Sequence, residues 1–164
     1  MVNNVLFLVT FLVICFGFVV LFGAPYLPTH SKQIDIALDL LNLKKGQTLL
    51  ELGAGDGKVA LRALSRGLHV VAIEFNPLLC IIIWLRTRKY RGKIKIMCGN
   101  FWALRWPDAD GIYVFLLDRY MKKLDTRITM RYKSIKLASY VFQVPEKAIK
   151  AQKDGVFLYN YKRI

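Results

Sequence analysis

The residues best suited to bind a ligand form a glycine-rich segment, Glu51–Gly57, with the sequence ELGAGDG. It overlaps the end of a short apolar run, Thr48–Leu52, and precedes the helix-like segment Lys58–Ser65. Glycines allow the backbone to approach a ligand closely, and the first turn of a helix offers unpaired N–H groups. The segment therefore predicts a ligand-binding loop between a strand and a helix.

The spacing of the glycines indicates which cofactor fits this loop. Gly53, Gly55 and Gly57 follow the pattern G-x-G-x-G. The dinucleotide fingerprint G-x-G-x-x-G would need a glycine where the chain has Lys58. This difference favours S-adenosylmethionine over a nicotinamide cofactor.

An acidic residue ends the next apolar run. Glu74 follows Val71-Ala72-Ile73 and lies 21 residues after Gly53. A carboxylate at the carboxyl end of a second strand can accept hydrogen bonds from both hydroxyls of a ribose. We therefore expect Glu74 to bind the ribose of the cofactor. The alternative is a solvated acid at the end of a strand.

Further candidates follow the later apolar runs. Asn100 could read the adenine edge through its amide, and Phe101 could pack on the adenine face. A turn and a core aromatic would explain the same two residues. Asp118, after the run Gly111–Leu117, could orient the methyl acceptor, but an exposed helix-capping acid explains it as well. The catalytic residues are otherwise unassigned.

Several common chemistries lack their signatures. The run Gly111–Leu117 is not followed by the Asn/Asp-Pro-Pro-aromatic motif of enzymes that methylate exocyclic base amines, and the chain has no Pro-Cys pair. Cys15, Cys80 and Cys98 stand singly in apolar stretches, far from the spacings of a zinc site or a disulfide framework. We therefore expect no metal site and three reduced, buried thiols.

Alternating strands and helices must position these residues. With Thr48–Leu52 there are six readable strands, and such alternation predicts an α/β fold. We expect a Rossmann-like, mostly parallel sheet of six to seven strands with helices on both faces. The other expected strands are His69–Glu74, Lys93–Cys98, Gly111–Leu117, Ser139–Val144 and Gly155–Tyr161. The other expected helices are Ser31–Asn42, Leu78–Tyr90 and Asp118–Ile135, with a short helix-like piece at Glu146–Gln152.

The N-terminal segment predicts a membrane anchor. Residues 5–22 are 18 uncharged, mostly apolar residues, which as a helix would reach ~27 Å. A cleaved signal peptide is the alternative, but the start of the chain has no charged side chain. We expect one transmembrane helix in residues 1–24 and a single domain in residues 25–164. The positive-inside rule would place this domain of a single-pass membrane protein on the cytoplasmic side, or on the equivalent side of another membrane.

The chain is strongly basic. It has 25 Lys and Arg against 11 Asp and Glu, a net charge of +14, and all of these residues lie in residues 32–164. Such a domain attracts anionic partners. Beside a transmembrane helix, an anionic lipid surface ranks before nucleic acid. The oligomeric state is left open.

Three features together resemble one enzyme family. They are the glycine segment, the sequence Glu74-Phe75-Asn76-Pro77, and Pro25-Tyr26-Leu27-Pro28-Thr29 directly after the apolar segment. The combination resembles the membrane-anchored seven-strand protein lysine methyltransferases, whose members modify the c-subunit of ATP synthase and the adenine nucleotide translocase. The resemblance covers roughly residues 5–160. It implies the methyltransferase fold and S-adenosylmethionine as the cofactor.

The resemblance also implies roles for individual residues. The glycine segment would line the methionine and ribose side of the cofactor, and Asn100 the adenine, where the family usually has an acid. Tyr26 and Thr29 would fold over the pocket; a stiff linker is the alternative. The family's C-terminal hairpin is recognisable here only as the strand Gly155–Tyr161. The full set of expected cofactor-binding residues is Tyr26, Thr29, Glu51, Gly53, Ala54, Gly55, Gly57, Glu74, Phe75, Asn100 and Phe101.

The expected function is S-adenosylmethionine-dependent methylation of lysine on a membrane-associated protein, because anchoring raises the effective concentration of membrane partners. Two alternatives remain. The first is methylation of RNA or of a small or lipid acceptor, for which the basic charge would attract an anionic substrate. The second is a non-catalytic, membrane-tethered module that keeps the fold and the cofactor site.

Overall fold

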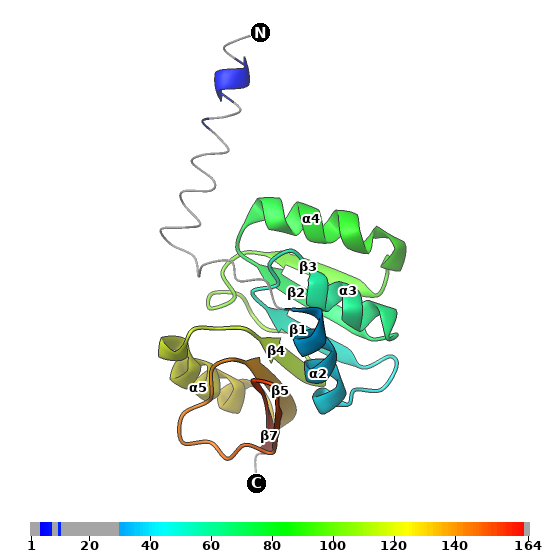
Figure 1. Ribbon diagram of the computed structural model, residues 1–164. Coiled ribbons are helices and arrows are strands. Elements are labelled where there is room, and N and C mark those ends of the chain that lie inside the picture. Colours follow the sequence, from blue (N-terminus) through cyan, green and yellow to red (C-terminus); the bar gives the residue numbers. More distant parts are fainter. Residues whose placement is uncertain (1–3, 8–9, 11–29, 163–164) are drawn as a thin grey trace.

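The computed structural model describes residues 4–7, 10 and 30–162. Its centre is a seven-stranded sheet in the order β3-β2-β1-β4-β5-β7-β6 (Figure 1). The first five strands in this order are parallel, and β7 lies antiparallel between β5 and β6. The strands are β1 Thr48–Leu52, β2 His69–Glu74, β3 Ile94–Cys98, β4 Gly111–Val114, β5 Ser134–Tyr140, β6 Ala151–Lys153 and β7 Val156–Lys162.

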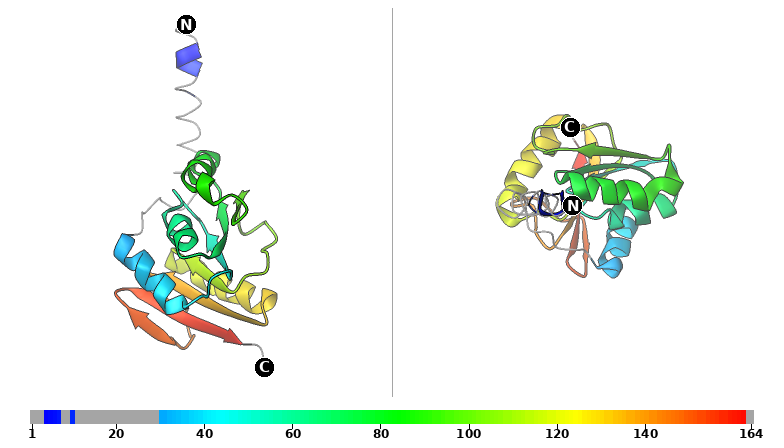
Figure 2. Two further views of the ribbon diagram at one scale, coloured as in Figure 1. Left: turned by 90° about the vertical axis from the view of Figure 1, so that its right-hand side faces the viewer. Right: turned by 90° about the horizontal axis from the view of Figure 1, so that it is seen from above.

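Helices cover both faces of the sheet, as the sequence predicted. Three helices that follow one another in the chain lie on one face, and α5 lies on the other (Figures 1 and 2). Short 3-10 turns follow α4 and precede α5. The helices and turns are α2 Ser31–Leu41, α3 Lys58–Ser65, α4 Pro77–Thr87, η1 Arg88–Tyr90, η2 Asp118–Tyr120 and α5 Met121–Arg131.

The central strands are buried on both faces, which explains their almost continuous apolar sequences. Successive side chains of a strand point to opposite faces. Leu49 of β1 therefore packs in the layer under α2 and α3, whereas Leu50 packs in the layer under α5. Trp106, from the connection between β3 and β4, fills the second layer, which has a single α-helix among the described residues.

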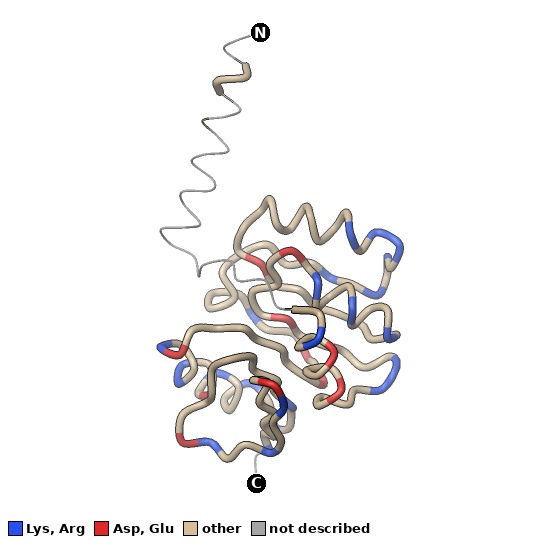
Figure 3. Tube along the Cα trace, in the orientation of Figure 1, with Lys and Arg blue, Asp and Glu red and all other residues tan. Residues whose placement is uncertain are grey.

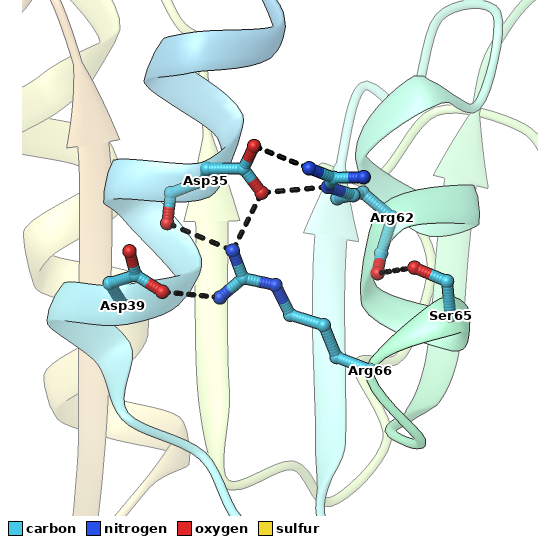
Figure 4. Close-up of polar contacts among 5 residues, drawn as sticks. All are labelled: Asp35, Asp39, Arg62, Ser65 and Arg66. Atoms are coloured by element: carbon cyan, nitrogen blue, oxygen red, sulfur yellow. Dashed lines mark hydrogen bonds and ion pairs between the residues drawn. The ribbon is translucent and has the colours of Figure 1, made fainter.

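Charged residues lie mostly in the helices and turns (Figure 3). Between α2 and α3 they form a network in which Asp35 binds Arg62 at 2.6 Å and Arg66 at 2.6 Å, and Asp39 binds Arg66 at 2.5 Å (Figure 4). The hydrogen bond from Arg62, with further help from Arg66, lowers the pKa of Asp35 from 3.8 to about 2. The network fixes α3, the helix that follows the glycine segment.

The C-terminal elements differ from those that the sequence predicted. The expected helix Asp118–Ile135 is shorter, because Tyr132 leaves the helix with an extended backbone and β5 starts at Ser134. The expected strand Ser139–Val144 is displaced accordingly. The piece Glu146–Gln152 is not a helix; its end belongs to β6, which pairs with β7 in an antiparallel hairpin. The sheet therefore has seven strands, and the hairpin is present.

The cysteines differ in their burial. Cys80 is buried in α4, where its Sγ donates to the Glu74 carbonyl at 3.5 Å. Cys98, the last residue of β3, is exposed, so the prediction of a buried thiol is wrong at this position. Cys15 lies outside the described residues.

The predicted transmembrane helix and the single-pass membrane location need correction. Among the described residues, no helix is both long enough and apolar enough to cross a membrane. Most of residues 5–22 lie outside the described part of the chain, and so does the predicted domain boundary between residues 24 and 25. The structure thus supports the seven-strand Rossmann-like fold without an assigned transmembrane helix.

Candidate active site

The glycine segment lies at the point where the sheet changes direction. β1 has β2 on one side and β4 on the other, so the connections that leave these strands diverge at their carboxyl ends. Open α/β sheets bind ligands in the crevice at such a point. The carboxyl ends of β1 and β2 bring Glu51 and Glu74 to this edge, together with the loop that follows β1.

The backbone of this loop requires glycine. Gly53, Gly55 and Gly57 all have positive φ angles, of 75°, 56° and 77°, which side chains other than glycine rarely adopt. The N–H groups of Gly53 and Ala54 donate to the Ile73 carbonyl at 2.9 and 3.0 Å, so β2 holds the start of the loop. Gly57 ends the loop as the N-cap of α3.

The glycines differ in the space beside them. A Cβ atom at Gly57 would lie 3.0 Å from the Ile83 side chain of α4, so Gly57 permits the packing of α4 on the loop. A Cβ atom at Gly53 would meet no described atom within 4 Å. The backbone at Gly53 is therefore open on the side where a cofactor would approach, and this observation fits the predicted cofactor.

Glu74 holds the loop from the side of β2. Its Oε2 accepts a hydrogen bond from the Gly55 N–H at 2.8 Å, and its Oε1 accepts one from the Asn76 N–H at 2.9 Å. Each carboxylate oxygen has two acceptor positions, so two positions remain for hydroxyl donors. The structure thus shows a role in fixing the loop that the sequence did not predict. The predicted contact with ribose stays a prediction.

Glu51 is buried beneath the loop, with 2% of its surface exposed. Burial raises the pKa of its carboxyl well above the ordinary value, and the charges of Glu74 and Asp56 raise it further, whereas a hydrogen bond with the Ala60 backbone lowers it. Within the described residues its Oε2 has no hydrogen-bond partner. A buried acceptor of this kind is costly unless a ligand satisfies it.

Arg86 contributes to the site although sequence reasoning missed it. Its Nη1 donates to Asp56 Oδ2 at 2.5 Å and to the Asp56 carbonyl at 2.9 Å. α4 thereby holds the last part of the glycine segment. No local pattern connects two residues 30 positions apart, so only the folded chain reveals this pair.

The residues predicted to contact the adenine lie after β3. The Asn100 Oδ1 accepts a hydrogen bond from the Trp102 N–H at 2.9 Å, which is the turn that the sequence offered as the alternative. Phe101 is partly buried in the layer under α5, with its ring 4.6 Å from that of Trp102. Phe75 is exposed directly after Glu74. The contacts of these side chains with a cofactor stay predictions.

The structure says less about the roles predicted for Asp118, Tyr26 and Thr29. Asp118 is exposed, and it is the first residue of η2. It follows β4 on the same edge of the sheet as the glycine loop, but its expected role remains a prediction. Tyr26 and Thr29 lie outside the described residues.

The basic helix α5 has a structural role on one of its sides. Arg127 donates to the carbonyls of Trp102 and, at 2.6 Å, Leu104. Arg131 donates to the Trp106 carbonyl at 3.0 Å and pairs with Asp108 at 2.6 Å. These two arginines hold the connection between β3 and β4, which contains Asn100 and Phe101.

Comparison with solved structures shows the fold. An RNA methyltransferase from Salinibacter ruber in complex with S-adenosyl-L-homocysteine superposes with a TM-score of 0.75 and 21% sequence identity, over 82% of this chain and 92% of that one. The strand order and the final hairpin thus belong to a known methyltransferase architecture.

Several related sequences are lysine methyltransferases. The chain is 27% identical to the human ATP synthase C-subunit lysine N-methyltransferase over 109 residues, which are 63% of this chain and 45% of that protein. It spans about half the length of the human, mouse, rat and Xenopus laevis relatives of this name. A protein-lysine N-methyltransferase from Saccharolobus islandicus is 25% identical over 150 residues, covering 82% of this chain and 92% of that protein.

One protein family matches the site itself. The match covers residues 51–151, from the buried glutamate of β1 to the start of β6, and the family is described as the ANTKMT methyltransferase domain. The matched segment includes the glycine loop, Glu74 and the connection between β3 and β4 that α5 holds. Because this match covers more than half of the chain, the chain belongs to the ANTKMT methyltransferase domain family.

Proposed function

We propose that this chain is an S-adenosylmethionine-dependent protein lysine methyltransferase. The observation that carries the proposal is a pair of buried carboxylates at a glycine loop whose backbone is open at Gly53: Glu51 at the end of β1, and Glu74, which binds the loop at Gly55. Family membership and the lysine methyltransferases among the related proteins support the same reaction.

The residues at the carboxyl ends of β1 and β2 can be assigned to separate parts of this cofactor. We assign the remaining acceptor positions of Glu74 to the ribose hydroxyls and the open backbone at Gly53 to the close approach of the cofactor. Glu51 would receive the positively charged amino group of the methionine part, because a cation favours the ionised form of a buried carboxyl. Asn100 keeps a side-chain amide for the adenine while its oxygen holds the turn.

When bound, S-adenosylmethionine supplies a methyl group on a positively charged sulfur. The chain must then align a neutral lysine nitrogen with that group and keep water out. The reaction requires no dedicated catalytic base if the lysine loses its proton on entry. Asp118, exposed after β4, is the candidate for orienting the amine.

A calorimetric titration tests the cofactor site. We expect S-adenosylmethionine to bind the full chain, and Glu74→Ala to abolish binding, because the substitution removes both the ribose acceptor and the acceptor for the Gly55 N–H. Glu146→Ala is the matched control, since Glu146 is an exposed glutamate beyond β5. Failure of the unmodified chain to bind would contradict the proposal.

Transfer of a labelled methyl group tests the acceptor. Membrane and soluble protein fractions and total RNA should be offered separately with labelled S-adenosylmethionine, and mass spectrometry should locate the label. We expect label on lysine side chains of protein. A chain that binds the cofactor and labels no acceptor would be the non-catalytic module instead.

RNA is the second candidate acceptor. The net charge of +14 and the likeness to an RNA methyltransferase from Salinibacter ruber favour it. Contacts between basic side chains and phosphates weaken steeply as salt rises. Label on RNA that disappears at raised salt, with none on protein, would replace lysine by a nucleotide acceptor.

A further inference from the structure

Helix α4 exposes an apolar stripe. Ile81, Trp84 and Leu85 have 54%, 50% and 48% of their surfaces exposed, and Arg88 continues the same side of the helix. These positions follow the spacing i, i+3, i+4 and i+7, which places them on one face. An exposed, continuous apolar stripe of this kind usually marks a contact surface.

The stripe is not needed for packing within the domain. The opposite side of α4, with Cys80, Ile83 and Thr87, is the buried one and packs against α3, β2 and β3. α4 forms one end of the domain, and no described element lies over its outer side (Figures 1 and 2). A helix that is apolar on both sides has a second apolar environment to satisfy.

Basic residues continue the stripe at the end of α4. Residues 75–107 contain seven Lys and Arg and no Asp or Glu. Arg86 is engaged by Asp56, whereas Arg88, Lys89, Arg91 and Lys93 are exposed in and after η1. Figure 3 shows them as a blue stretch at the C-terminal end of the helix. The surface thus combines apolar side chains with a cluster of one charge.

We propose that this α4 surface, formed by Ile81, Trp84 and Leu85 with the basic cluster after them, docks on an anionic lipid surface. The apolar side chains would enter the boundary between headgroups and acyl chains, where tryptophan is favoured. The basic cluster would contact the lipid phosphates. The contact is peripheral, requires no spanning helix, and goes beyond the proposed methyl transfer.

A second copy of the chain fits this surface less well. Two copies whose α4 helices met side by side in the same direction would bring their basic clusters close together, and like charges oppose such contact. In either direction, residues 75–107 contribute no carboxylate that could pair with the basic cluster of the other copy. A surface of anionic lipids offers opposite charge beside every position of the cluster. α4 starts three residues after Glu74, so docking would hold the cofactor edge of the sheet near the lipid.

The test needs a signal that is local to α4, because residues 5–22 are also apolar and total vesicle binding would not separate the two segments. Lipids with brominated acyl chains quench a tryptophan that enters them. Vesicles should be made of brominated phosphatidylcholine, alone or with an equal amount of phosphatidylserine. The difference between the full chain and Trp84→Phe then isolates Trp84, since both chains contain the partly buried Trp102 and the buried Trp106.

We expect quenching that depends on Trp84 and is stronger in the anionic vesicles. The triple variant Arg88→Glu, Lys89→Glu, Arg91→Glu should lose most of it, because each basic residue near an anionic surface contributes about fivefold to binding. The matched control is Lys44→Glu, Lys45→Glu, Lys150→Glu, which changes the charge equally at exposed sites away from α4. Circular dichroism and thermal unfolding show whether each variant is folded, independently of cofactor binding.

Three results would overturn the proposal. Trp84 could remain unquenched in both vesicles, or the control variant could lose as much quenching as the α4 variant. Trp84 emission could also change with protein concentration in the absence of lipid, which would make a second copy the occupant. A chain that fails to bind the cofactor but still shows the Trp84 signal would overturn the proposed function alone.

Discussion

Arg86 Nη1 lies 2.5 Å from Asp56 Oδ2 and 2.9 Å from the Asp56 carbonyl, and this double contact ties α4 to the glycine loop. The loop is held at two other points, by Glu74 at Gly55 and by the Ile73 carbonyl at Gly53. Its geometry therefore depends on two separate elements, β2 and α4.

Arg86→Ala should weaken binding of S-adenosylmethionine about fivefold, equivalent to about 1 kcal/mol, because the pair is partly exposed and such pairs contribute little more. The loss would arise from a less ordered loop. Calorimetry measures it, with Arg88→Ala as the control in the next turn of the chain. Equal affinity of Arg86→Ala and the unmodified chain would show that the contact does not order the loop.

Gly53→Ala should abolish or strongly reduce cofactor binding. Gly53 and Gly92 both have positive φ angles, and at neither would a Cβ meet a described atom within 4 Å. Alanine should therefore lower the free energy of unfolding by a similar amount at each, about 1–2 kcal/mol. Binding should fall only at Gly53, where the Cβ would occupy the space assigned to the cofactor.

The comparison with Gly92→Ala separates strain from a direct clash. Thermal unfolding measures the first effect, and calorimetric titration measures the second. If the two variants bind the cofactor equally well, the open side of Gly53 is not where the cofactor lies.

Glu51→Gln should change how stability depends on pH. The folded chain raises the pKa of Glu51, so folding favours the protonated form. Stability linked to this proton is fully present below the ordinary pKa of about 4.3 and is lost as the pH rises through the raised pKa. The unmodified chain should therefore lose stability toward alkaline pH relative to Glu51→Gln, which has no proton to release.

Denaturant unfolding over a series of pH values measures this difference. Ligand binding gives a second check: if the cofactor amine favours the ionised carboxyl, binding should release a proton, seen as a binding heat that varies with the buffer. That release should be absent in Glu51→Gln. A pH-independent difference in stability between the two chains would contradict a raised pKa.

Much of the fold could be predicted because its signals are local. The glycines after β1 lie within a few residues of the apolar run around Leu50, and Glu74 directly follows the apolar run that ends at Ile73. The secondary-structure predictions were wrong where contacts with residues far away in the chain determine the local structure. Residues 146–152 have helix-forming composition, but the end of this segment pairs with β7 as an edge strand, and pairing overrides propensity.

The site was predicted less completely than the fold. Short motifs predicted Glu51, Glu74 and the glycines as cofactor-binding residues, and their contacts with a cofactor stay predictions. The structure adds that Glu74 also holds Gly55, that Asn100 holds a turn, and that Arg86 reaches Asp56. These contacts join residues through space, and no spacing rule in the sequence encodes them.

Arg127→Ala should destabilise the domain by about 2 kcal/mol, because hydrogen bonds from a charged group are among the stronger ones and Arg127 makes two of them. The guanidinium donates to the carbonyls of Trp102 and Leu104 and lies over the Trp106 ring. Lys122→Ala is the control, as Lys122 is exposed on the same helix. If denaturant unfolding shows a similar loss of stability for both variants, the loss comes from α5 itself and not from the contacts of Arg127 with the connection between β3 and β4.

Asp35→Asn should lower stability at neutral pH and make the chain less sensitive to acid. The folded chain lowers the pKa of Asp35 from 3.8 to about 2, so the stabilisation is present above 3.8 and is lost as the pH falls toward 2. The loss at neutral pH should be up to about 1 kcal/mol, since Arg62 and Arg66 are partly solvated. Asp39→Asn, which removes only the pair with Arg66, should cost less. Denaturant unfolding should be measured at several pH values between 3.8 and about 2. The stabilities of the unmodified chain and Asp35→Asn should converge as the pH falls, because protonated Asp35 no longer binds the arginines as an anion. A stability difference that stays constant down to the lowest pH would show that the network between α2 and α3 does not depend on this charge.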